Sequence, residues 1–377
     1  MTNQISAAPS KSITSHIHTK PHFITVSKLI TIPALPRTSP KINSYTMIDF
    51  GVIGTSTISH NFAAHAHASG QWNLRAVYSR SKVTAQAFAS KHGQGQSPKI
   101  YTTIEGLAGD ESIQAVYIAS PNSLHYSHAK TCLEGGKHVI LEKPSTSTSA
   151  ELATLFAAAH SHGVLLLEAH RHLQEANFKA LRSGLPLLGA IYGASLTYAS
   201  YSSRYDAVLA GAEPNIFSLE FSGGSLVDIG VYGVAAAVAL FGPPKSATYD
   251  PVIVATGVDG GGPVVLRYEG FAVTVLQSKC YTSTAPSEVY GEKGTLRVNG
   301  VTDIDSVEFV DAKTKAVTKL GGEKCKYNLM EECVEFARII NSRDHEEAAK
   351  LETLSKEVLK VTEKLRKDNG IIFAVER

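Results

Sequence analysis

Apolar residues in the first half of the chain fall into short continuous runs, and amphipathic stretches with helical spacing separate these runs. Such runs are typical of strands buried on both faces, and their alternation with helices indicates a parallel sheet covered on two sides. The predicted strands are 48–53, 74–78, 115–119, 138–141 and 164–167, and the predicted helices lie around 61–68, 82–91, 125–134 and 150–160. This half is therefore predicted to be a doubly wound α/β domain of the nucleotide-binding type.

The pattern changes after about residue 170, where apolar and polar positions alternate over longer segments. Alternation predicts half-buried strands, and the short Gly-containing turns at 268–271 and 291–294 predict antiparallel hairpins. The expected strands are 190–201, 252–256, 264–268, 271–280, 288–290, 295–298 and 307–310, and amphipathic helices are expected at 327–340 and 346–367. The predicted fold is an α/β domain followed by an α+β domain with a large, mostly antiparallel open sheet.

A length of 377 residues allows about two domains. The first 46 residues contain no Asp or Glu and lack helical periodicity. We therefore expect 1–46 to be a disordered extension, with a mitochondrial presequence as the alternative. The nucleotide-binding domain is placed at 47–168, and a substrate-binding and dimerisation domain at 169–377, with the C-terminal helices packing back on the body.

Charge and composition narrow the class of protein further. With 36 Lys and Arg against 34 Asp and Glu, the chain lacks the basic excess that nucleic-acid phosphates require. The uncharged stretch 183–203 is too polar for a membrane span, and 229–244 is too short. The four cysteines lie far apart, which predicts free thiols in a reducing compartment such as the cytoplasm.

The turn after the first strand has the composition of a dinucleotide-binding loop. Its spacing is Gly54-x-Ser56-x-x-Ser59, so small residues stand where the GxGxxG pattern has its second and third glycines. Small side chains still permit close approach of a pyrophosphate, and the start of the next helix offers free N–H groups. An ordinary strand-to-helix turn is the alternative. The predicted cofactor contacts of this Rossmann-type loop are Gly51, Gly54, Thr55, Ser56, Thr57 and Ile58.

The end of the second strand carries basic and hydroxyl side chains in place of a carboxylate. An enzyme that prefers NAD usually has an Asp or Glu here for the ribose 2′-hydroxyl, whereas this chain has Ser79, Arg80 and Lys82. A guanidinium pairs with a phosphate through two parallel hydrogen bonds, so NADP(H) is predicted as the preferred cofactor. A solvated basic helix start is the alternative.

Three further segments resemble one family of oxidoreductases. They are 119–125 (ASPNSLH), 136–144 (GKHVILEKP) and 226–232 (LVDIGVY), and together they are similar to the Gfo/Idh/MocA family from Ile48 to the C-terminus. Tyr232, where much of the family has His, matches the subgroup that contains glucose-fructose oxidoreductase and dimeric dihydrodiol dehydrogenase. The resemblance implies a homodimer or larger homo-oligomer. It also implies cofactor contacts at Ser120, Pro121, Asn122, His125, Glu142 and Lys143.

The same segments supply residues suited to hydride transfer. Oxidation of a carbinol carbon requires a group that removes the hydroxyl proton, and a phenol with an ordinary pKa of about 10 does this poorly near neutral pH. A nearby ammonium lowers that pKa, so we predict that Lys143 assists Tyr232. Asp228, one helical turn before Tyr232, is predicted to orient Lys143 or a substrate hydroxyl. Taken singly, Tyr232 also suits a core aromatic residue and Asp228 a helix cap.

The His-rich stretch 160–172 has the composition of a metal site, but hydride transfer to a nicotinamide needs no metal and none is predicted. Glu168, Arg171 and His172 are instead weaker candidates for substrate contacts.

Together these features predict an NADP-dependent oxidoreductase that acts on a secondary alcohol or carbonyl of a sugar, polyol or cyclic diol. The expected partner is a small-molecule substrate, with neither nucleic acid nor a membrane involved. The alternative is a non-catalytic NADP-binding regulator resembling the galactose repressor of yeasts. The presence of Lys143, Asp228 and Tyr232 together favours the enzyme.

Overall fold

The computed structural model describes residues 46–377. The expectations for 1–46 therefore lie outside the described residues, apart from Thr46. Within the described part, no helix is both long and apolar enough to cross a lipid bilayer.

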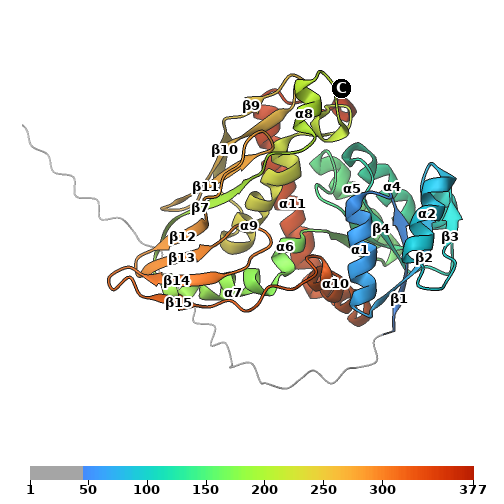
Figure 1. The fold of residues 1–377 in the computed structure, drawn as a ribbon, viewed down its shortest axis with the longest axis horizontal. Coiled ribbons are helices and arrows are strands. Elements are labelled where there is room, and N and C mark those ends of the chain that lie inside the picture. The colour runs from blue at the N-terminus through green and yellow to red at the C-terminus, as the bar shows by residue number, and fades with distance from the viewer. Residues whose placement is uncertain (1–45) are drawn as a thin grey trace, which may run out of the picture. The chain divides into compact units, whose positions relative to one another are not determined.

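The first half of the described chain forms a six-stranded sheet in which all neighbouring strands run parallel (Figure 1). Its strands are β1 (Ile48–Ile53), β2 (Trp72–Tyr78), β3 (Lys99–Tyr101), β4 (Ala115–Ile118), β5 (His138–Leu141) and β6 (Leu166–Glu168). The strand order is β3-β2-β1-β4-β5-β6. From β1 the chain adds strands first on one side and then, from β4 on, on the other, so the topological switch point, where ligands of such sheets bind, lies between β1 and β4. The predicted doubly wound fold is confirmed. The sequence did not predict β3, because its three residues are partly exposed and form no apolar run.

Helices cover both faces of this sheet. The first face carries α1 (Thr57–Ala68), α2 (Lys82–His92) and α10 (Met330–Ser342), and the second carries α3 (Ile104–Ala108), α4 (His125–Glu134) and α5 (Ser149–His162). α10 comes from the far end of the chain, and the indole Nε1 of Trp72 donates a hydrogen bond to the Cys333 carbonyl oxygen (2.8 Å). A C-terminal helix thus completes the core of the first domain.

The second sheet of the described residues has nine strands and is mostly antiparallel, as predicted. The strands are β7 (Ile191–Ala199), β8 (Ser246–Tyr249), β9 (Val252–Ile253), β10 (Asp259–Arg267), β11 (Ala272–Ser278), β12 (Ser287–Gly291), β13 (Gly294–Val298), β14 (Val307–Asp311) and β15 (Val317–Lys319). Both predicted hairpins are confirmed, as β10 pairs with β11 and β12 pairs with β13. The parallel pairing of β7 with β11 is the exception to the antiparallel pattern.

One face of the second sheet packs against helices. α9 (Val231–Phe241) approaches β11 so closely that a Cβ on Gly233 would collide with the Val275 side chain. The sheet lies on one side of α9 and α11 (His345–Asp368) on another, so α9 is apolar nearly all round. The remaining α-helices of this half are α6 (Arg171–Gln174), α7 (Ala176–Gly184) and α8 (Tyr205–Leu209).

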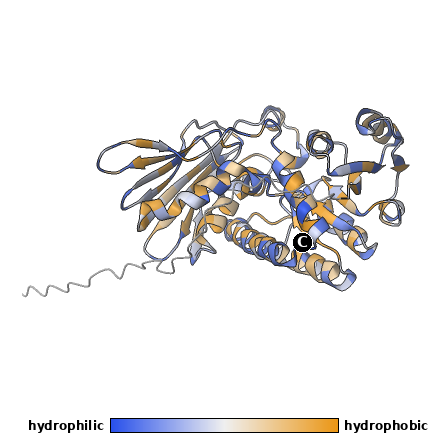
Figure 2. Cartoon of the chain, turned by 90° about the horizontal axis from the view of Figure 1, so that it is seen from below, coloured by the Kyte–Doolittle hydropathy of each residue, from blue (hydrophilic) through white to orange (hydrophobic). Residues whose placement is uncertain are grey.

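α11 joins the cores of the two halves. Leu359 packs in the core of the first sheet, whereas Val358, Val361 and Leu365 pack in the core of the second. Figure 2 shows long helices on which hydrophobic stripes alternate with hydrophilic ones, as amphipathic helices require. The cores of the two sheets are therefore connected through buried side chains of α11.

Candidate active site

The loop between β1 and α1 is shaped to receive an anion. Gly54 has φ +97°, and a Cβ at this position would lie 2.6 Å from the Ala119 carbonyl oxygen, so only glycine fits. The first turn of α1 contains no acidic residue, and the side chain of its N-cap, Ser56, makes no capping hydrogen bond. The backbone N–H groups at this helix start are therefore available to a phosphate.

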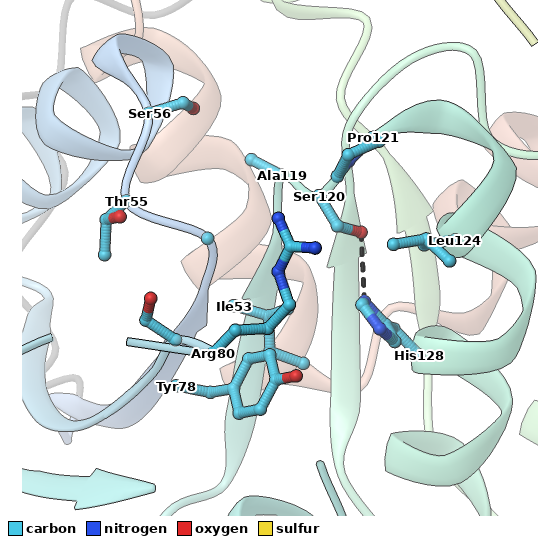
Figure 3. Close-up of a pocket in the computed structure, with 12 residues that line it drawn as sticks. Ile53, Thr55, Ser56, Tyr78, Arg80, Ala119, Ser120, Pro121, Leu124 and His128 are labelled. Atoms are coloured by element: carbon cyan, nitrogen blue, oxygen red, sulfur yellow. Dashed lines mark hydrogen bonds between the residues drawn. The ribbon is translucent and has the colours of Figure 1, made fainter. Parts of the chain in front are cut away.

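A cavity of about 220 Å³ lies at the carboxyl edge of the first sheet, next to this loop. It brings together seven of the predicted cofactor residues, and in Figure 3 the Arg80 guanidinium extends into the space between the loop and β4. The lining residues are Ile53, Gly54, Thr55, Ser56, Tyr78, Ser79, Arg80, Ala119, Ser120, Pro121, Leu124 and His128. The size and lining of this cavity fit the adenosine end of a dinucleotide.

Eight of the fifteen predicted cofactor residues are not among the lining residues of this cavity, and four of these eight, Asn122, His125, Glu142 and Lys143, are described below. Gly51 lies inside β1, against Leu107 and Ile113. Thr57, Ile58 and Lys82 lie in the first turns of α1 and α2.

His128 lines the cavity but was not identified from the sequence. Its Nδ1 lies 3.0 Å from the Ser120 hydroxyl oxygen, as the dashed line in Figure 3 marks. Burial, with the charges of His125 and Arg80, lowers the pKa of His128 to about 4. The ring is therefore uncharged at neutral pH. One signal was present, because His128 follows His125 by three positions and so lies on nearly the same face of α4.

Asn122 and His125 hold loops together. The Asn122 amide donates a hydrogen bond to the Ser222 carbonyl oxygen (3.0 Å), which links the two halves of the chain. The two ring nitrogens of the buried His125 lie 2.8 and 2.9 Å from the carbonyl oxygens of Pro144 and Ser120. His125 therefore fixes the loop that carries Lys143.

The predicted catalytic residues come together beyond the carboxyl end of β5. The Lys143 ammonium donates hydrogen bonds to Oδ1 (3.0 Å) and to the backbone oxygen (2.7 Å) of Asp228. The same Nζ lies 4.9 Å from the centre of the Tyr232 ring. The peptide bond between Lys143 and Pro144 is cis. Within the described residues, no group hydrogen-bonds the Tyr232 hydroxyl, so the phenol is available to a substrate.

Asp228 lies in one turn of π-helix, Leu226–Gly230, that leads directly into α9. Such turns occur frequently at functional sites. Buried side chains hold this turn, since Asp259 accepts hydrogen bonds from the Leu226 backbone N–H and from the Tyr249 hydroxyl (both 2.6 Å). The sequence placed Asp228 one turn before Tyr232 but contained no signal for the wider helical turn.

Lys279 is a second functional candidate that the sequence missed. It follows β11, and its ammonium hydrogen-bonds Oδ2 of Asp228, the carboxylate oxygen that Lys143 leaves free. A single Lys after a strand carries no recognisable motif, because 51 residues separate it from Asp228 in the chain. Only the packing of the π-helical turn against β11 brings it to the site.

Burial and charge act in opposite directions on the ionisable groups. Burial would raise the pKa of Asp228, but Lys143 and Lys279 hold it well below its usual value. Burial also raises the pKa of Tyr232, and this effect outweighs the lowering by Lys143 and Arg171. The predicted lowering influence of Lys143 on the pKa of the phenol is thus present, and the burial of the ring opposes it.

Among the weaker candidates, Arg171 and His172 both lie next to Tyr232. The Arg171 guanidinium is 5.8 Å from the centre of the Tyr232 ring and donates to Asp303 (2.5 Å). His172 is fully buried, and its Nε2 lies 3.1 Å from the Tyr232 backbone oxygen. His172 therefore holds the backbone of Tyr232 in place. Glu168 accepts a hydrogen bond from the Ser145 backbone (2.8 Å), which gives it a role in holding the loop after Lys143.

Glu142 is buried beside Lys143. It accepts a hydrogen bond from the Tyr117 hydroxyl (2.6 Å) and one from the Lys143 backbone N–H (3.2 Å). Within residues 46–377, no group of three or more His, Cys, Asp or Glu side chains is arranged to hold a metal ion.

Two family models match the chain. Residues 48–170 match the model described as an oxidoreductase family with an NAD-binding Rossmann fold, and residues 186–297 match the GFO/IDH/MocA C-terminal domain.

Individual proteins match over most of the chain. The uncharacterized oxidoreductase YgjR of Escherichia coli (strain K12) is 38% identical over 88% of this chain and 99% of its own length. The NADP(+)-dependent scyllo-inositol 2-dehydrogenase IolU of Bacillus subtilis (strain 168) is 36% identical over 88% of this chain and 100% of its own. The fold is similar to that of KijD10, a 3-ketoreductase from Actinomadura kijaniata solved with NADP and TDP-benzene, with a TM-score of 0.72, 22% identity and coverage of 85% and 98% of the two chains.

The match of both family models in their expected order, and the identity to full-length relatives, confirm the resemblance found in the sequence. The chain belongs to the Gfo/Idh/MocA family of oxidoreductases.

Proposed function

We propose that the protein is an NADP-dependent dehydrogenase that interconverts a secondary alcohol of a cyclic polyol or sugar with the corresponding ketone. The cluster of Lys143, Asp228 and Tyr232, at the same sheet edge as the nucleotide cavity, carries this proposal. The relative IolU supports the substrate class and the cofactor, because its name specifies scyllo-inositol and NADP(+).

The chain's own residues would handle the substrate oxygen and its proton. The nicotinamide, when bound, supplies a hydride acceptor or donor. In the oxidation direction, the Tyr232 phenolate takes the proton of the substrate hydroxyl while the hydrogen on the same carbon leaves as hydride, and a ketone remains. The Lys143 ammonium donates a hydrogen bond to the substrate oxygen and stabilises the phenolate electrostatically. The proton that Tyr232 has taken passes to solvent before the next turnover.

The preference for NADP rests on the charges at the adenosine end. Gly54 and the start of α1 would hold the pyrophosphate, and Ser79 and Arg80 the 2′-phosphate. Within residues 46–377, no carboxylate forms an ion pair with Arg80, so its guanidinium is free for a phosphate.

A substrate survey tests the proposed function directly. NADPH fluorescence should be quenched on binding, and the protein should reduce NADP⁺ with at least one member of a panel of inositols, pentoses, hexoses and cyclic diols. NADPH binding without turnover of any panel member would contradict the proposal and would favour a regulatory protein.

We also propose that the protein forms a homodimer or a larger homo-oligomer. The outer face of the second sheet carries the partly exposed Val265 and Leu276 and the exposed Tyr290. In Figure 1 the helices of the described chain lie on the opposite side of this sheet. A second copy that covers the face would bury these side chains. Light scattering at micromolar concentration should give at least twice the mass of one chain, and a monomer mass would contradict the assignment.

A further inference from the structure

Asp228 is shared by two lysines that arrive from different parts of the fold. Lys143 comes from the loop after β5 and contacts Oδ1, and Lys279 comes from the end of β11 and contacts Oδ2. The Asp228 side chain is 28% exposed, whereas those of Lys143 and Lys279 are 12% and 3% exposed. Both carboxylate oxygens are thus occupied by ammonium groups, and the carboxylate is the most accessible of the three.

Burying the Lys279 ammonium costs free energy that an apolar side chain at this position would not cost. Among the described residues, Asp228 is the hydrogen-bond partner of its ammonium, and the Phe217 ring covers the group at 4.8 Å. A buried ion pair contributes little net stability compared with well-packed apolar residues of similar volume. An apolar residue would fill the same space against Phe217, so the fold alone does not account for a lysine here.

The charge of Lys279 changes the electrostatic balance around Tyr232. Without it, the charges of Lys143 and Asp228 would cancel. With it, the three groups carry one net positive charge. The other titratable or charged side chains that face or influence Tyr232 are Arg171 and His172 on α6, Glu142 at the end of β5 and Tyr198 on β7.

We propose that Lys279 is a positioning residue that neutralises Asp228, so that the Lys143 ammonium acts on the substrate oxygen and the Tyr232 phenolate. This proposal rests on the proposed dehydrogenase function. Through Asp228, Lys279 would set the pH at which Tyr232 accepts a proton, without touching the substrate itself.

Lys279→Met tests this role, because it removes the charge and keeps most of the volume. A positive charge stabilises the phenolate and lowers the pKa of Tyr232, so its removal raises that pKa. In the alcohol-oxidation direction, the rising limb of kcat/KM against pH should therefore move to higher pH by about one unit, at the lower end of the roughly 1–3 units that a charge within 4–6 Å produces, because Lys279 acts through Asp228. We expect kcat at pH 7 to fall about tenfold or more, and NADPH affinity to remain unchanged. Lys279→Arg keeps the charge and should restore the wild-type profile.

Lys137→Met is the matched control. Lys137 is also buried, and its ammonium donates hydrogen bonds to the carbonyl oxygens of Asp110 and Ile113. These residues precede β5 and β4, so they lie at the amino ends of the strands, away from the candidate active site. This control should lower the melting temperature without moving the pH profile. If Lys279→Met loses stability but keeps the wild-type profile, or if Lys279→Arg shifts the profile as much as Lys279→Met, Lys279 is only structural. If Lys279→Met does not fold, Lys279→Gln provides the same comparison. Wild-type protein without turnover would instead overturn the proposed function and this proposal together.

Discussion

Tyr232→Phe is expected to lower kcat by about 10²–10⁴-fold, the usual contribution of general acid–base catalysis. The variant removes only the hydroxyl, for which no hydrogen-bond partner is present among the described residues, so the packing of the ring on His172 and Tyr198 is kept. NADPH affinity and melting temperature should stay close to those of the wild type. Steady-state kinetics on the best substrate, fluorescence titration with NADPH and thermal unfolding measure the three quantities.

The coupling between Tyr232 and Lys143 sharpens this expectation. Lys143→Met should lower kcat by a similar factor, because it removes the ammonium 4.9 Å from the centre of the Tyr232 ring and the proposed hydrogen bond to the substrate. Since the two residues serve one proton transfer, the double variant should lose little more than the worse single variant. Tyr268→Phe, which removes a buried hydroxyl outside the site, is the control. Additive losses, or a Tyr232→Phe enzyme within a few-fold of wild type, would place the proton transfer on another group.

Arg80→Ala is expected to weaken NADPH binding about 10–100-fold while changing NADH binding less than about threefold. The reason is that a hydrogen bond to a charged group contributes about 1.5–3 kcal/mol, and each 1.4 kcal/mol changes a dissociation constant about tenfold. The Arg80 guanidinium lies in the nucleotide cavity, and only NADPH carries the 2′-phosphate that would pair with it. Dissociation constants for both cofactors, measured by fluorescence at one ionic strength, provide the comparison.

Lys91→Ala controls for a general loss of positive charge. Lys91 lies in the last turn of α2, the helix that follows Arg80, and does not line the cavity. The Lys91→Ala variant should bind NADPH and NADH nearly as tightly as the wild type does. Equal weakening of NADPH and NADH by Arg80→Ala would mean that the guanidinium contacts a part that the two cofactors share.

The sequence by itself determined the order and type of the elements in the first domain. Mostly apolar runs such as Ile48–Ile53 and His138–Leu141 are local signals, because a strand buried on both faces needs apolar residues at nearly every position. The chemistry at the ends of these strands was also readable, since Gly54, Arg80 and Lys143 lie within two residues of the ends of predicted strands. In a parallel sheet the carboxyl ends meet at one edge, so local positions were enough to place these residues near a common ligand.

Only the tertiary structure decided which groups surround the reacting residues. Lys279 reaches Asp228 because the π-helical turn that carries Asp228 packs against β11, and Arg171 meets Asp303 across 132 residues of sequence. No local pattern encodes such contacts, because periodicity reports which face a residue lies on but not which distant residue it faces. The net effect on Tyr232 was likewise hidden from the sequence. The motif indicated a lysine that lowers the pKa of the phenol, but how far burial opposes that effect depends on the packing of α6, β7 and α9 around one ring.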